Sequence, residues 1–83
     1  MRKYKPLQDY LACQTAKRLT LSMQEIEKIL ADELSASAYR HVAWWSNSIT
    51  HRHIQCFAWM ESGYQTVHVK DTIRNGCITF EKQ

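Results

Sequence analysis

Residues 51–56 read His-Arg-His-Ile-Gln-Cys, and histidine and cysteine are the side chains that most often bind transition metals. Cys77 could add a fourth ligand to His51, His53 and Cys56. Structural zinc sites normally take paired ligands from both ends of the site, and here the second pair is missing. Metal binding is therefore the weakest functional interpretation, because Cys56 also fits an apolar position of a helix.

Patterns typical of catalytic sites are missing from the chain. With only two glycines it has no Gly-rich phosphate loop, and it has no recognisable set of nucleophile, histidine and acid. The acidic residues between positions 25 and 33 fit a solvated helix face. We therefore expect a protein that is not an enzyme and needs no cofactor.

Positive charge is distributed unevenly along the chain, whose net charge is +3. Residues 1–18 contain five Lys or Arg and one acidic residue. Residues 35–60 contain Arg40, Arg52 and three histidines but no acidic residue. A basic segment next to an acid-free segment is typical of a surface that faces phosphates.

The elements that would position these residues follow from apolar spacing and capping signals. Pro6 suits the start of a helix, Ser22 begins a Ser-x-x-Glu capping box, and Gly63 suits a helix end. After Gly63 the apolar period changes from helical to two, which indicates strands around an Asn-Gly turn. The predicted helices cover about residues 6–17, 22–32, 37–47 and 51–62, and the predicted strands cover about 64–69 and 77–81.

This order of elements predicts a single α+β domain over residues 1–83. Three or four helices precede a C-terminal β-hairpin, in which Val67, Val69, Ile78 and Phe80 are expected to face the helices. Two short helices joined by a brief turn form a helix-turn-helix, and the terminal hairpin completes the order of a winged helix. Three scattered cysteines, no membrane-length apolar run and no signal peptide predict a cytoplasmic protein with reduced thiols.

The predicted third helix carries the strongest candidate binding surface. Steps of about 100° per residue place Ala38, Val42 and Trp45 on the buried side. Arg40, Trp44 and Asn47 then fall on the opposite, outward side. A guanidinium, an indole and a carboxamide there could bind phosphates and base edges. Alternatively, a covering segment would make Trp44 structural, and a helix-cap role would make Asn47 structural.

Several motifs have a combined spacing that is specific. They are Pro-Leu-x-x-Tyr-Leu from Pro6, Glu-Ile-Glu-x-Ile-Leu from Glu25, Ser-Ala at 37–38 and Trp-Trp-Ser-Asn at 44–47. With them the chain resembles a widespread bacterial and phage family of small domains of unknown function. The resemblance implies a reader or adaptor and no particular activity. Ser35 departs from the proline usual in that family, and the loop after Asn47 looks slightly longer.

Together these observations favour a non-catalytic nucleic-acid-binding domain, with DNA as the expected partner. The third helix would present Arg40, Trp44 and Asn47, and phosphate contacts would come from Lys17, Arg18, Arg52, Lys70 and Arg74. The alternative is a protein-interaction module encoded by a phage or bacterium, such as an inhibitor or adaptor of a host defence or regulatory complex. Tryptophan, tyrosine and arginine are the residues that anchor such interfaces.

Overall fold

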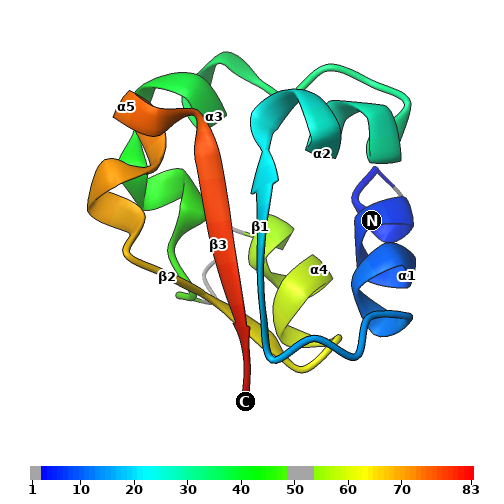
Figure 1. Ribbon diagram of the computed structural model, residues 1–83. Coiled ribbons are helices and arrows are strands. Elements are labelled where there is room, and N and C mark those ends of the chain that lie inside the picture. Colours follow the sequence, from blue (N-terminus) through cyan, green and yellow to red (C-terminus); the bar gives the residue numbers. More distant parts are fainter. Residues whose placement is uncertain (1–2, 49–53) are drawn as a thin grey trace.

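Short helices pack on one face of a small antiparallel sheet in the computed structural model, which describes residues 3–48 and 54–83 (Figure 1). The α-helices are α1 (Lys5–Ala12), α2 (Met23–Leu30), α3 (Ala36–Arg40), α4 (Phe57–Met60) and α5 (Thr72–Asn75). The strands are β1 (Arg18–Ser22), β2 (Tyr64–Val67) and β3 (Cys77–Lys82). The 3₁₀-helices are η1 (Val42–Trp45), η2 (Ile54–Cys56) and η3 (Val69–Asp71). The predicted α+β class is confirmed.

The last strand lies in the centre of the sheet, because the strand order is β1-β3-β2 and both pairings are antiparallel. Its inner face is apolar, and Ile78 and Phe80 are fully buried there as predicted. The outer face is polar, with a hydrogen bond of 2.9 Å between the hydroxyls of Thr20 and Thr79. One face packed against helices and one face in water is the usual arrangement of an antiparallel sheet.

The N-terminal third of the chain differs from the prediction, because the first helix ends at Ala12 instead of residue 17. Residues 18–22 form a strand that the sequence interpretation missed, although Leu19 and Leu21 alternate with polar residues. The strand exists because β3, about sixty residues further on, supplies its hydrogen-bond partners. The second helix begins as predicted: Ser22 Oγ accepts from Glu25 N–H at 3.0 Å, and Glu25 Oε1 accepts from Ser22 N–H at 2.8 Å.

The predicted third helix over 37–47 is interrupted. Helix α3 ends at Arg40, His41 has an extended backbone with φ −124° and ψ 118°, and η1 follows. The helical projection assumed about 100° per residue over residues 37–47. It therefore does not predict which side chains are buried beyond His41. The predicted fourth helix is also shorter, since only Phe57–Met60 is α-helical and residues 51–53 lie outside the described part.

Strands β2 and β3 pair as predicted, but they are not joined by a two-residue turn. The connection contains η3 and α5, and Gly76 ends α5 with φ 69°, a left-handed conformation that suits glycine. The inward residues of β2 are Tyr64 and Thr66, so the expectation that Val67 faces the helices is wrong. Val69 belongs to η3, where it packs against the core from outside the sheet.

Ser35 should be replaceable by proline with a gain in stability. Its φ of −66° is the angle that a proline ring imposes, and it precedes the first residue of α3. Its Oγ is buried without a hydrogen-bond partner in the described part of the chain. We expect Ser35→Pro to raise the free energy of unfolding by about 0.4–1 kcal/mol, because the unfolded chain loses freedom.

Urea unfolding of Ser35→Pro and Ser35→Ala would test this. The alanine variant removes the buried hydroxyl and leaves the backbone free, so any further gain in the proline variant measures the backbone effect. A proline variant less stable than the alanine variant would contradict the expectation.

Candidate functional site

Both tryptophans of the Trp-Trp pair lie in the core. Trp45 is fully buried as predicted, and its Nε1–H donates to the Ala38 carbonyl at 2.8 Å. Trp44 is only 9% exposed, so its expected outward position is wrong. The Tyr4 ring covers it edge-on, with ring centroids 5.8 Å apart, and the break at His41 turns the indole inward. Trp59 extends this aromatic cluster, with its ring stacked 5.9 Å from that of Trp45.

The side chain of Asn47 connects three elements instead of pointing outward. Its Nδ2 donates to the Thr66 carbonyl at 3.1 Å, and its Oδ1 accepts from Thr66 N–H at 3.0 Å. The same Oδ1 accepts from Trp59 Nε1–H at 2.9 Å. The carboxamide thus pairs with β2 as a neighbouring strand would. We call Asn47, Trp59 and Thr66 the asparagine clasp.

A signal for the clasp was present in the sequence. A buried indole N–H needs an acceptor, and Trp59 had no obvious partner within its own helix. The Thr66 hydroxyl adds a bond to the Trp45 carbonyl at 2.6 Å, which ties η1 to β2. The expectation that Asn47 belongs to an outward constellation is therefore wrong, because its polar atoms are used inside the molecule.

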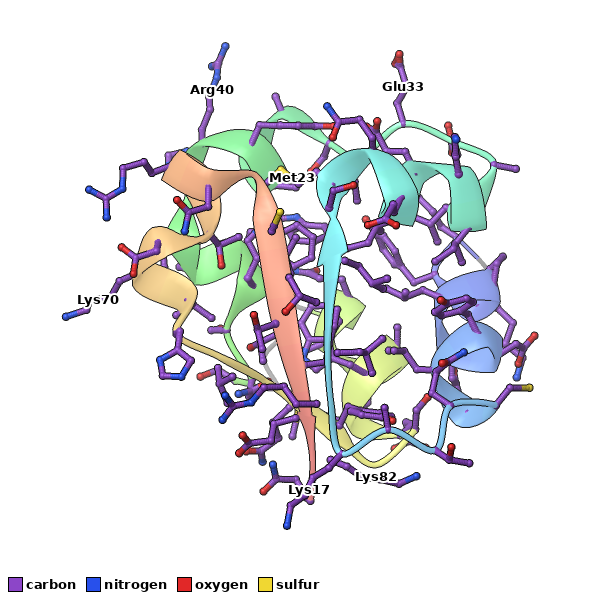
Figure 2. All side chains as sticks on the ribbon, viewed as in Figure 1. Lys17, Met23, Glu33, Arg40, Lys70 and Lys82 are labelled. Atoms are coloured by element: carbon purple, nitrogen blue, oxygen red, sulfur yellow. The ribbon has the colours of Figure 1, made fainter. Side chains whose placement is uncertain are left out.

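Two of the predicted phosphate contacts, Lys70 and Arg74, lie on neighbouring elements, and Arg40 from the predicted recognition helix lies on a connected segment. Arg40 ends α3, Lys70 lies in η3 and Arg74 lies in the last turn of α5, and all three are exposed. Segment η3 contacts both α5 and η1, and η1 contacts α3, so the three residues lie on connected elements. Figure 2 shows two of these side chains in solvent, with Arg40 pointing upward and Lys70 pointing to the left. We call Arg40, Lys70 and Arg74 the basic face.

The basic face has a net positive charge. Asp71 is the acidic residue within η3 and α5, and it accepts from Arg74 Nη2 at 2.9 Å. The Arg74 side chain is nevertheless 80% exposed, so the ion pair leaves most of the guanidinium in water. Arg40 and Lys70 make no ion pair within the described residues.

The remaining predicted contacts do not join the basic face. Lys17 and Arg18 lie at the other end of the sheet, and Figure 2 shows Lys17 near Lys82, far from Arg40. Arg18 Nε donates to Glu81 Oε2 at 3.0 Å, and the guanidinium lowers the pKa of that carboxyl. Arg52 lies outside the described residues. The predicted cations that the structure describes therefore form two groups, one on the basic face and one at the opposite end of the sheet.

Cysteine and histidine do not gather into a metal site in residues 3–48 and 54–83, where no three His, Cys, Asp or Glu residues are suitably grouped. Cys56 is buried, its Sγ lies 3.3 Å from the Ser48 carbonyl oxygen, and burial raises the pKa of its thiol. Cys77 lies at the start of β3. His51 and His53 lie outside the described part, so the predicted ligand set that joins them to Cys56 and Cys77 is not tested.

Comparison with known proteins gives one match. The model of a family described as a domain of unknown function covers residues 4–81. No curated protein and no solved structure matched the chain. Within the described residues, no helix has the length and apolar character needed to cross a membrane.

Proposed function

Because the chain belongs to the DUF7662 family, which has no assigned activity, we propose a function from its own geometry: a non-catalytic nucleic-acid-binding domain. The contact surface is the basic face, and DNA is the expected partner. This proposal keeps the exposed Arg40 and leaves out Trp44 and Asn47, whose side chains are used in the core and the clasp.

One observation carries the proposal. Lys70 and Arg74 follow Arg40 by thirty or more residues, yet η3 contacts both α5 and η1, the segment that follows α3. Asp71 supplies the carboxylate within η3 and α5. Cations arranged in this way bind successive phosphates and release condensed counterions. In this proposal the connection between β2 and β3, which carries Lys70 and Arg74, would correspond to the wing of a winged helix.

A labelled DNA duplex is titrated with the protein at several salt concentrations. We expect log K to fall by about 0.9 per phosphate contact for each tenfold rise in salt, hence by about 2.7 for three contacts. Replacing Arg40 and Lys70 together by glutamate should weaken binding at low salt by at least about tenfold and flatten this slope. Lys17→Glu combined with Lys28→Glu is the matched control, since both lysines are exposed and lie outside the basic face.

Absence of binding at about 50 mM salt would refute the proposal, because phosphate contacts are strongest at low ionic strength. Equal losses in the test variant and the control variant would also contradict it. That result would mean that net charge alone, and not the basic face, attracts the duplex.

A protein-interaction module is the second candidate, favoured by exposed aromatic rings. Tyr10, Tyr39 and Phe57 are 36%, 40% and 37% exposed. Tyr10 lies on α1 and Phe57 on α4, and these helices pack against each other. A side-chain hydrogen bond with Glu27 raises the pKa of the Tyr39 phenol to about 12. Retention of one protein by the immobilised chain after nuclease treatment, and its loss in Tyr10→Ala with Phe57→Ala, would favour this function.

A further inference from the structure

The two asparagines of the chain, Asn47 and Asn75, differ in what surrounds their carboxamides. Both polar atoms of the Asn47 carboxamide are engaged in the asparagine clasp. Asn75 lies in the last turn of α5, is exposed, and makes no side-chain hydrogen bond in residues 3–48 and 54–83. A chemical change of an asparagine side chain is therefore expected at Asn75 and not at Asn47.

Glycine follows Asn75, and an asparagine before glycine can modify itself. The backbone nitrogen of the following residue attacks the side-chain Cγ and forms a cyclic imide. The carboxamide nitrogen leaves as ammonia, together with the proton of the attacking nitrogen. Water then opens the imide at either carbonyl and leaves aspartate or isoaspartate. Glycine favours the ring closure, because it has no Cβ to crowd the attacking nitrogen.

The folded chain restrains the nitrogen that would attack. Gly76 N–H donates to the Thr72 carbonyl at 2.8 Å, and this bond closes the last turn of α5. The Gly76 carbonyl accepts from Met23 N–H at 2.9 Å, which holds the residue to the start of α2. A nitrogen in such a bond is directed at the Thr72 carbonyl instead of the Asn75 side chain. Reaction therefore requires the bond between Gly76 and Thr72 to open.

Helix α5 is short enough to open locally. It contains four residues, whereas isolated helices below about 12 residues are marginal in water. Its N-cap residue, Asp71, makes no side-chain cap bond, since its carboxylate accepts from Arg74. Support from the core comes through Thr72, which is buried, and Ile73, which is partly buried. Because stability is not uniform across a fold, such a turn can open while the sheet stays formed.

We infer that Asn75 is a self-modification site and that the opening of α5 controls its reaction. Once Gly76 N–H is released, its nitrogen attacks Asn75 Cγ, and hydrolysis of the imide leaves an aspartyl or isoaspartyl residue. The new carboxylate lies next to Arg74, whose side chain is 80% exposed, so the positive charge of the basic face falls. The modification itself goes beyond the proposed function, and only its effect on nucleic-acid binding rests on that function.

The test incubates the full chain in mildly alkaline buffer, where the backbone nitrogen loses its proton more readily. Peptide mass spectrometry and an isoaspartate-specific methylation assay should detect product at residue 75 and none at Asn47. Asn75→Gln should abolish the product, because the longer side chain closes a ring far less readily. A synthetic peptide of residues 70–80 lacks the packed α5 and should react at least about tenfold faster than the folded chain.

Two variants separate opening of α5 from a general loss of stability. Ile73→Ala removes packing that holds α5, so hydrogen exchange of the Gly76 amide and product formation should both accelerate by at least about tenfold. Ile29→Ala is the matched control, because Ile29 is also a partly buried isoleucine packed against the core but lies on α2. It should leave both rates close to those of the wild-type chain.

Equal acceleration by Ile73→Ala and Ile29→Ala would overturn the inference, because the reaction would then follow global unfolding. Product formed equally at Asn47 and Asn75 would overturn it too, as would an unmodified Ile73→Ala chain after the peptide has reacted completely.

Modified and unmodified chains, separated by ion exchange, are then titrated with the DNA duplex. We expect weaker binding by the modified chain, since the added carboxylate opposes phosphate contacts at Arg74. Equal binding would count against the proposed function and leave the modification site established.

Discussion

Replacing Asn47 by alanine is expected to destabilise the fold by about 3 kcal/mol or more, although the residue removed is small and polar. The change leaves Trp59 Nε1–H, Thr66 N–H and the Thr66 carbonyl without their partner. An unsatisfied buried donor or acceptor costs about 1–3 kcal/mol each. Urea unfolding followed by tryptophan fluorescence would measure the loss.

Asn75→Ala is the control for this variant, because Asn75 is exposed in the last turn of α5 and forms no side-chain bond in the described part. We expect it to change the free energy of unfolding by less than about 0.5 kcal/mol. Asn47→Asp keeps an acceptor but places a carboxylate against the Thr66 carbonyl, so it should also destabilise. A stable Asn47→Ala protein would mean that water replaces the carboxamide, and the clasp would then lose its structural role.

Removing Trp45 should have the other large effect. Trp45→Ala empties the centre of the aromatic cluster and removes a buried hydrogen bond, so we expect a loss of about 3–5 kcal/mol. Trp44→Ala should also cost well over 1 kcal/mol, because Trp44 is buried between Tyr4 and Trp45. Chemical denaturation of both variants would measure these losses.

Tyr10→Ala provides the comparison for these tryptophan variants, since it removes an aromatic ring that is 36% exposed. Its cost should be far smaller, because much of that ring is already in contact with water. A Trp44→Ala protein as stable as wild type would restore the earlier interpretation of Trp44 as a surface residue.

Local signals in the sequence were sufficient for part of the fold. The capping box at Ser22, the buried position of Trp45 and the pairing of the last two strands were predicted, because each depends on near neighbours or on a regular period. Strand β1 was missed, because its partner β3 lies at the other end of the chain. Strand formation depends on such partners more than on local preference.

The candidate site was less predictable than the fold. Arg40 was correctly placed on the surface because α3 is regular up to that residue. Trp44 and Asn47 were misplaced because the projection assumed an unbroken helix through His41. The gathering of Arg40 with Lys70 and Arg74 depends on contacts between η1, η3 and α5, which no local pattern contains.

The asparagine clasp has a consequence for assembly. A sheet that offers two open edges can add copies at both and grow into a fibre, whereas a sheet with one open edge stops after a single addition. Asn47 closes the β2 edge at Thr66 with a side chain, so growth from that side is blocked without a proline or a charged residue. Loss of the clasp would therefore be expected to convert a self-limiting sheet into one that can polymerise.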